Sequence, residues 1–343
     1  MLCRTANELY WMGRHIERAE NTARMLDVTY RMSLLPYEVV EPGLAWAEPW
    51  AVPLISSGLA TAYYKRFPQL SAENVLRFMI LDASNPSSIF CCLRAARESA
   101  RSVRGAITSE MYEDLNSAWL DMRVQDYAAI QLTGVSAFLE WVKMRSHLFR
   151  GVTFGTMLRD EAYHFIRLGT HLERADNTAR ILDVKYHTLL PSAADVGGAV
   201  DYYQWSALLR SVSGFESYRK IYSDVITPRR VAELLILRDD MPRSLHACLD
   251  LIYEALEALC DDNTRNVERI AGELHAKLHY GSTDQIIRFG LHEYLMEFLD
   301  RISALGSEIN KSFLVPTYEP QVSSAVQPVT NGQTQEMKAI HSD

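Results

Sequence analysis

Residues 6–30 read ANELYWMGRHIERAENTARMLDVTY, and residues 162–186 read AYHFIRLGTHLERADNTARILDVKY. Fourteen of the 25 aligned positions are identical, and the two segments are offset by 156 residues. A second pair of segments, 75–93 and 231–249, keeps the same offset with seven identities in 19 positions. The chain therefore repeats itself, and the repeat predicts two homologous halves.

The repeated segment has the periodicity of a long helix. Apolar or small residues recur at spacings of three and four from Leu9 to Tyr30, and the second copy repeats the pattern. This spacing places one continuous apolar stripe on an α-helix. Leucine–proline pairs at Pro36 and Pro191 predict the ends of the two helices, because proline cannot continue them. Since no convincing run of alternating strands occurs, we predict an all-α protein.

Length and the repeat together predict the domain organisation. The 343 residues divide into two helical repeats of about 156 residues, at 1–156 and 157–312, and a remainder at 313–343. We expect a duplicated helical bundle with two pseudo-symmetric halves. The remainder is polar, aperiodic and punctuated by proline, which predicts a disordered tail. The glycine-containing stretch 146–156 is predicted to be a loop that joins the halves.

Composition excludes several classes of protein. Hydrophobic residues make up 48% and charged residues 23%, a balance typical of globular proteins. No apolar run is long enough for a membrane span, and a net charge of −8 argues against non-specific nucleic-acid binding. Five cysteines without metal-ligand spacing, and a start that lacks a signal-peptide pattern, predict a cytoplasmic protein.

Polar residues on the repeated helix form the candidate functional cluster. Most lie more than about 100° from the apolar stripe, and they are the same in both copies. A free surface face would diverge between copies, so we expect a helix that is buried on both sides. The cluster comprises Glu17, Arg18, Asn21, Arg24 and Asp27 in the first copy and Glu173, Arg174, Asn177, Arg180 and Asp183 in the second.

Two interpretations of this cluster remain open. In the first, it is a buried polar network that clamps neighbouring helices, with ordinary i,i+4 pairs such as Glu20–Arg24. Buried ion pairs resist change without any ligand, because breaking one is costly. In the second, the arginines, asparagines and glutamates bind a carboxylate, a phosphate or a peptide backbone.

Other histidines and cysteines give weaker signals. Glu161 and His164 have the E-x-x-H spacing of carboxylate-bridged di-iron bundles, but the first half lacks the second required motif. His275 and His279 lie at i,i+4 without the glutamate of H-E-x-x-H, which favours a solvated helix face. We therefore predict no metal and no cofactor. Two matched pairs are expected to be structural. His15 and His171 are expected to be half-buried histidines with satisfied hydrogen bonds, and Cys92 and Cys248 to be small buried hydrophobes.

Several longer motifs resemble the bacterial alpha-E domain family, also called domain of unknown function 403. They are LYWMGRHIERAENTAR at 9–24, NPSS at 85–88, LRAARESAR at 93–101, SHLFRG at 146–151 and LGTHLERADNTAR at 168–180. The resemblance covers roughly residues 1–312 and implies an all-helical, cytoplasmic protein. The family's Glu-Arg motif falls on Glu17-Arg18 and Glu173-Arg174.

The resemblance also implies partners. Family members are found fused to, or encoded beside, circularly permuted ATP-grasp proteins and transglutaminase-like proteins. ATP-grasp enzymes make amide bonds through acyl phosphates, so the system is associated with peptide synthesis or modification. No ATP-grasp segment is recognised in this chain, and such a partner is expected to be a separate protein.

Three hypotheses of function follow. The first is a non-catalytic helical scaffold, or a partner that presents a peptide or anionic substrate to an ATP-grasp amide ligase. The second is an enzyme in its own right, with Glu17 and Glu173 as acid–base groups and the arginines binding an anionic substrate. It predicts a water-filled pocket and raised carboxylate pKa values. The third is a self-associating structural protein, since the sequence leaves the oligomeric state open.

Overall fold

The computed structural model describes residues 1–33, 49–187, 198–262 and 264–315. Within these ranges every regular element is a helix and no strand occurs, so the predicted all-α class is confirmed. None of the helices in the described part of the chain is both long and apolar enough to cross a membrane. Pro36, Pro191 and residues 316–343 of the tail predicted at 313–343 lie outside the described residues. Phe313 and Leu314, which the prediction placed in the disordered tail, belong to the helical turn Asn310–Leu314.

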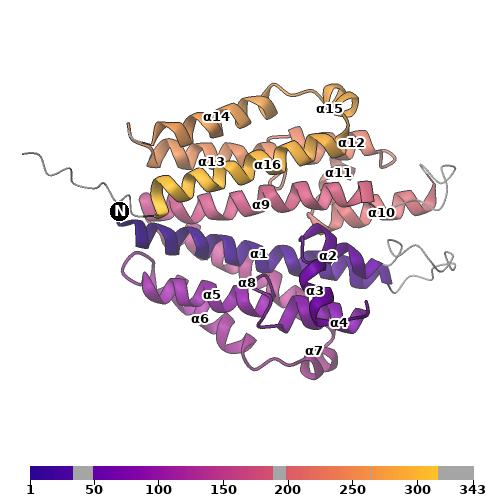
Figure 1. The fold of residues 1–343 in the computed structure, drawn as a ribbon, viewed down its shortest axis with the longest axis horizontal. Helices are drawn as coiled ribbons and strands as arrows, with labels where there is room; N and C mark the ends of the chain where they lie inside the picture. Colours follow the sequence, from indigo (N-terminus) through magenta and orange to yellow (C-terminus); the bar gives the residue numbers. More distant parts are fainter. Residues whose placement is uncertain (34–48, 188–197, 263, 316–343) are drawn as a thin grey trace, which may run out of the picture.

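Two long helices lie side by side at the centre of the molecule (Figure 1). They are α1 (Cys3–Ser33) and α9 (Glu161–His187). Helix α1 also packs against α5 (Ile89–Ser102) and α8 (Val135–Thr156). Helix α9 packs against α13 (Leu245–Leu259) and α16 (Leu291–Ile309) in the same way. Each central helix therefore has neighbours on more than one face.

The remaining helices extend these two groups (Figure 1). The first group contains α2 (Val52–Ser56), α3 (Ala60–Arg66), α4 (Ala72–Leu76), α6 (Ser109–Met122) and α7 (Tyr127–Thr133). The second contains α10 (Ala199–Ser211), α11 (Phe215–Tyr222), α12 (Pro228–Ala232), α14 (Arg265–His279) and α15 (Thr283–Phe289). Shorter helical turns are η1 (Pro49–Ala51), η2 (Arg77–Leu81), η4 (Glu233–Leu237) and η5 (Asn310–Leu314).

Helix bounds recur at a spacing of 156 residues. Helices α4 and α12, like α7 and α15, begin and end 156 positions apart. The residues before α8 and α16 are Gly134 and Gly290, with φ angles of +99° and +106°. Glycine adopts this conformation without the steric cost that other residues meet. The order of elements over 72–156 thus recurs over 228–309.

Two glycines allow the central helices to cross closely. A Cβ atom added to Gly13 would overlap the backbone carbonyl oxygen of Ile166, and one added to Gly169 would overlap that of Tyr10. The obstacle is backbone in both cases, so it cannot move aside as a side chain would. Gly13 and Gly169 lie 156 residues apart, and the crossing places the polar faces of α1 and α9 next to each other.

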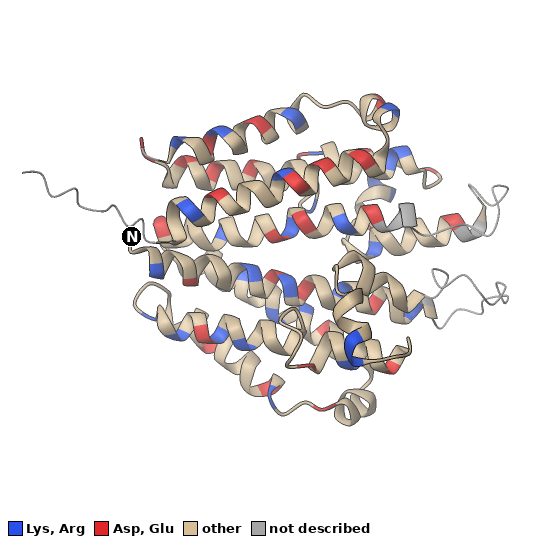
Figure 2. Ribbon diagram, in the orientation of Figure 1, with Lys and Arg blue, Asp and Glu red and all other residues tan. Residues whose placement is uncertain are grey.

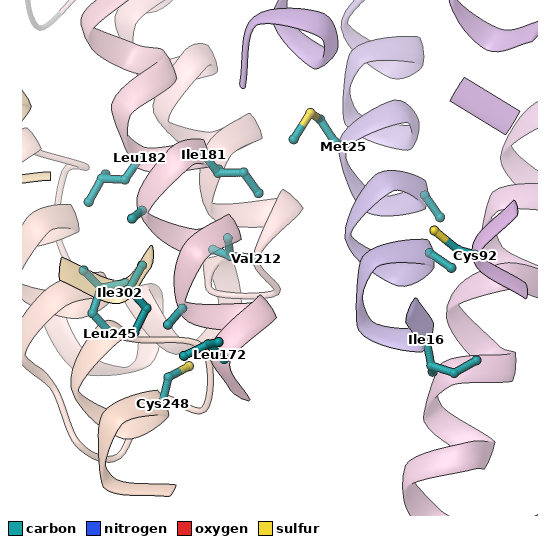
Figure 3. Close-up of a cluster of buried hydrophobic side chains, with 14 of the residues drawn as sticks. Ile16, Met25, Cys92, Leu172, Ile181, Leu182, Val212, Leu245, Cys248 and Ile302 are labelled. Carbon is teal, nitrogen blue, oxygen red and sulfur yellow. The ribbon is translucent and has the colours of Figure 1, made fainter. Parts of the chain in front are cut away.

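The apolar stripe of each central helix is buried, as the periodicity predicts. Ile16 on α1 and Leu172 on α9 lie in the hydrophobic core, which Figure 3 shows in close-up. Cys92 and Cys248 are fully buried there, and burial raises the pKa of each thiol to about 12. Their predicted burial is confirmed. The predicted satisfaction of His15 and His171 is wrong, because Nδ1 of each ring is buried without a hydrogen-bond partner among the described residues.

The predicted loop at 146–156 is wrong, because this stretch forms the second half of α8. Ser146, Phe149 and Thr153 recur at spacings of three and four and are all buried. Their packing outweighs the low helix propensity of the two glycines in this stretch. At the other end of the chain, η5 includes Phe313, whose ring contacts that of Phe165 at 5.7 Å.

Candidate functional site

The polar face of the two central helices is buried along with the apolar face. Glu17, Asn21 and Arg24 on α1, and Glu173 and Arg174 on α9, are all buried. Figure 2 shows these charged segments in the interior of the fold, where α1 and α9 meet. The prediction of a helix buried on both sides is therefore confirmed for α1, whereas Asp176, Asn177 and Arg180 on the polar face of α9 are only partly buried.

The two Glu-Arg motifs pair reciprocally across the helix crossing. Glu17 accepts hydrogen bonds from Nε and Nη2 of Arg174 at 3.0 and 2.8 Å. Glu173 accepts the equivalent bonds from Arg18 at 2.6 and 2.8 Å. Such two-pronged Arg–carboxylate contacts are strong and geometrically specific. Each motif thus pairs with the other motif rather than within itself.

Glu17 and Glu20 belong to a closed cluster filled by further arginines. Arg243 donates to Glu17 at 2.9 Å and to Glu20 at 2.6 Å. Arg150 from α8 lies 3.2 Å from Glu17 and also contacts Glu20. We call Glu17, Glu20, Arg150, Arg174 and Arg243 the closed cluster, because side chains of the chain itself occupy the space around both carboxylates.

The corresponding positions around Glu173 form an open cluster. Here Glu173 is held by Arg18 and by Arg14, whose Nε lies 2.8 Å away. Asp176 pairs with Arg180 at 2.8 and 3.1 Å. We call these five residues the open cluster. The positions 156 residues away from Arg243 and Arg150 are Ser87 and Gly306, which carry no charge.

A pocket with a volume of about 640 Å³ fills the space that these small residues leave. It is lined by the open cluster and by residues of α2, α16 and the turn before α5, including Ser87 and Gly306. The side chain of Arg180 is 40% exposed, whereas that of its counterpart Arg24 is 10% exposed. Both carboxylates of the closed cluster are 0% exposed, although Arg150 at its margin is 31% exposed, whereas the open cluster borders the pocket.

Asn21 connects the two clusters. Its Oδ1 accepts a hydrogen bond from Arg243 at 3.0 Å. Its Nδ2 has no hydrogen-bond partner among the described residues, although the residue is only 3% exposed and lines the pocket. Buried donors in proteins are normally satisfied. A ligand oxygen in the pocket would satisfy this one.

Electrostatics keep the central carboxylates ionised. Burial alone would raise the pKa of Glu173, but Arg14 and Arg18 outweigh it and bring that pKa to about 2. The same balance, with Arg174 and Arg243 as the cations, lowers the pKa of Glu17. An acid–base catalyst needs a pKa raised toward neutrality. The raised carboxylate pKa values predicted for an enzyme are wrong.

Three predicted residues lie at the margins of the clusters. Asp27 pairs with Arg31 at 3.0 Å and with Lys143 of α8 at 3.3 Å, and Asp183 lies 2.6 Å from His292 of α16. Both aspartates therefore pair with helices outside the crossing. Asn177 lines the pocket beside Asp176.

Arg14, Arg150 and Arg243 take part in the clusters but were missed in the sequence. Arg150 fell within the predicted loop, and Arg14 lies beside the motif without an identical counterpart in the second half. Arg243 lies 226 residues from Glu17, a separation that no local pattern spans. Arg243 faces Ser87 across the repeat, but this is one of twelve differences in a 19-residue block, so it gives no specific signal.

Comparisons with known proteins agree with this architecture. A family model described as a predicted alpha-helical domain with a conserved ER motif matches residues 1–314. Uncharacterised proteins of Mycobacterium bovis and Mycobacterium tuberculosis are 23% identical over 321 residues. That alignment covers 88% of this chain but 35% of each relative, so the chain spans about a third of their length. No solved structure matches significantly.

Proposed function

The chain belongs to the Alpha-E family, and we propose that it is a non-catalytic helical scaffold that binds a peptide or another anionic ligand and presents it to an ATP-grasp amide ligase. The observation that carries this proposal is the pocket beside the open cluster. It is charged, accessible and built from the family's Glu-Arg motif. A purely structural network would need no such opening, and the closed cluster shows how the same motif packs without one.

The pocket chemistry supports a ligand with oxygen acceptors. Arg18 and Arg180 are partly exposed in the pocket, and Asn21 contributes the unpaired donor. Guanidinium groups bind carboxylates and phosphates well, and Asp176 can accept from an amide or ammonium group. A volume of about 640 Å³ lies within the usual range for small-ligand sites. A peptide end or acidic side chain combines these features.

The ionised carboxylates and the buried thiols support a presenting role rather than a catalytic one. The carboxylates are held ionised by paired arginines, which leaves them poor proton donors and acceptors near neutral pH. Cys92 and Cys248 are buried, and the raised pKa of each thiol disfavours the thiolate nucleophile.

We also propose that the halves, 1–156 and 157–312, descend from one duplicated unit and form a pseudo-symmetric bundle. The identities at a constant offset support this, as do the matching helix bounds and the reciprocal Glu-Arg pairs. In this interpretation Arg150 and Arg243 closed the copy of the site around Glu17, and the copy around Glu173 stayed open.

The proposed partners rest on the family resemblance. An ATP-grasp protein, and in some systems a transglutaminase-like protein, would act with this chain in the cytoplasm. The mycobacterial relatives are about three times as long as the matched region, and their additional length could hold such a partner.

The test is reconstitution with an ATP-grasp protein of the kind that family members are found encoded beside. Pull-down with the purified proteins should show a complex, and the chain should raise ATP turnover or amide formation by the ligase. Arg180→Gln should reduce this effect, because it removes a cation from the open cluster. Arg31→Gln is the matched control, since it removes an exposed i,i+4 partner outside the pocket. The proposal fails if the two proteins do not associate and the chain does not change ATP turnover or amide formation by the ligase.

A further inference from the structure

Three histidines gather on the outer layer of the second half. His275 and His279 lie one turn apart on α14, and His246 faces them from α13. The three ring centroids are separated by 5.4 to 5.8 Å. One potential ligand nitrogen from each ring lies within 4.8 Å of the other two. The sequence predicted a solvated face for His275 and His279, but His275 is partly buried against α13.

The buried histidine has one ring nitrogen available as a ligand. His246 is almost fully buried, and its Nδ1 lies 2.8 Å from the carbonyl oxygen of Leu237. A carbonyl only accepts, so Nδ1 carries the proton and Nε2 is left as the free nitrogen. That Nε2 lies 3.5 Å from Asp250 Oδ1, another acceptor. Nε2 of His246 and Oδ1 of Asp250 are both electron-rich acceptors, so a cation bound between or beside them would be favoured.

Neighbouring groups hold the second ring in place. His275 Nε2 lies 2.7 Å from Asp250 Oδ1, and the ring stacks on Tyr253 with an interplanar angle of 13°. A carboxylate that orients a histidine is the usual outer shell of a histidine–metal site. His279 is exposed, which leaves a route for an ion to enter.

The first half shows that packing alone does not require histidines here. The residues 156 positions earlier are Phe90, Trp119 and Arg123. Phe90 and Trp119 contact each other edge-on, with ring centroids 5.1 Å apart. An apolar ring pair thus fills the same place between α5 and α6. In the second half, His246 and His275 stand in place of Phe90 and Trp119 and bring nitrogens that can bind a metal.

We propose that His246, His275 and His279 bind one divalent transition-metal ion between α13 and α14, with Zn²⁺ as the best match. Neutral imidazoles suit zinc, copper and nickel, and Asp250 supplies nearby negative charge. Tetrahedral zinc has Zn–N distances of about 2.0–2.1 Å, so small rotations of the exposed His279 would complete the set. The ion would pin α14 to α13 on the side of the bundle away from the pocket.

The test is zinc binding to the metal-free full-length chain by isothermal titration calorimetry. Wild-type protein should bind about one equivalent, and X-ray absorption should show nitrogen or oxygen neighbours at about 2.0 Å. His279→Gln removes the exposed ligand and should weaken binding at least about tenfold. The double variant His246→Phe/His275→Trp installs the ring pair of the first half, so it should fold and bind no zinc.

His164→Gln serves as the control, because it removes a histidine on α9 outside the cluster. It should bind zinc as the wild type does. The proposal is overturned if wild-type protein binds no more zinc than the double variant. It is also overturned if His164→Gln weakens zinc binding as much as His279→Gln does.

Discussion

Three guanidinium groups converge on the single carboxylate of Glu17, and two converge on Glu173. Because the motifs pair with each other, changing Glu17 and Arg18 together would break two separate bridges. The environments also differ: the side chains of Arg174 and Arg243 are 8% exposed, whereas those of Arg14 and Arg18 are 18% and 23% exposed. A cation that reaches water tolerates the loss of its partner better than one that does not.

Glu17→Gln should therefore lower the free energy of unfolding by about 3–5 kcal/mol, because it leaves the buried Arg174 without its carboxylate and leaves Arg243 with Glu20 alone. Urea denaturation followed by circular dichroism measures this loss. Glu173→Gln is the matched variant and should cost less, since Arg14 and Arg18 can be hydrated. Equal losses would contradict the division into a closed and an open cluster.

His15 and His171 give the fold a pH dependence. Burial, aided by Arg18, lowers the pKa of His15 to about 4, and burial lowers that of His171 well below its usual value. Below pH about 6.5 the unfolded chain takes up protons that the native histidines do not. Stability therefore falls between pH 6.5 and pH 4, before the low-pKa carboxylates such as Glu173 lose their charge.

His15→Gln should flatten this dependence. Between pH 7 and pH 5, wild-type protein should lose on the order of 1 kcal/mol more free energy of unfolding than the variant. Urea titrations at the two pH values measure the difference. If both proteins lose the same amount, His15 is protonated in the native state and its surroundings are wetter than the structure indicates.

At the scale of elements, the crossing of α1 and α9 depends on two glycines. Gly13→Ala places a methyl group against the backbone of Ile166, so we expect a loss of about 1–3 kcal/mol in the free energy of unfolding. Gly151→Ala in α8 is the matched control, because a Cβ there meets nothing within 4 Å. Gly151→Ala should raise the free energy of unfolding by about 0.5–1 kcal/mol, because alanine has a higher helix propensity than glycine. Thermal denaturation shows which of the two variants is destabilised and which is stabilised. If Gly13→Ala stabilised the protein, this would contradict the close crossing of α1 and α9.

The same helices show what the sequence can and cannot predict. Spacings of three and four predicted the buried stripe of α1, because burial of one face imposes that period. The same spacing is present in the second half of α8, at Ser146, Phe149 and Thr153, but two of these residues are polar and a loop was predicted there instead. The pairing of Glu17 with Arg243 joins residues 226 positions apart, so it depends on tertiary packing. The identity of the polar residues in both copies was visible, but not which cluster is open.

At the scale of the whole molecule, the surroundings of the two Glu-Arg motifs differ although the motifs themselves are identical. Ser87 and Gly306 stand where a strict repeat would place Arg243 and Arg150. These two positions decide whether chain atoms or a ligand occupy the space around the carboxylates. In the proposed duplication, the pocket follows from this difference in side chains, since the order of helices over 72–156 recurs over 228–309.

Ser87→Arg should close the pocket from within. The new guanidinium would stand beside Glu173 and Asp176 as Arg243 stands beside Glu17 and Glu20. Because the pair would be only partly buried, the free energy of unfolding should rise by no more than about 1 kcal/mol. The effect of the chain on its ATP-grasp partner should be lost while the complex itself persists, since the outer surface is unchanged.

Urea denaturation and the reconstituted ligase assay measure these two outcomes. Ser102→Arg adds the same side chain at an exposed position of α5 outside the pocket and should leave the ligase effect intact. If Ser87→Arg folds normally and the ligase effect is retained, the ligand does not enter this pocket. The open cluster would then be structural, like its closed counterpart.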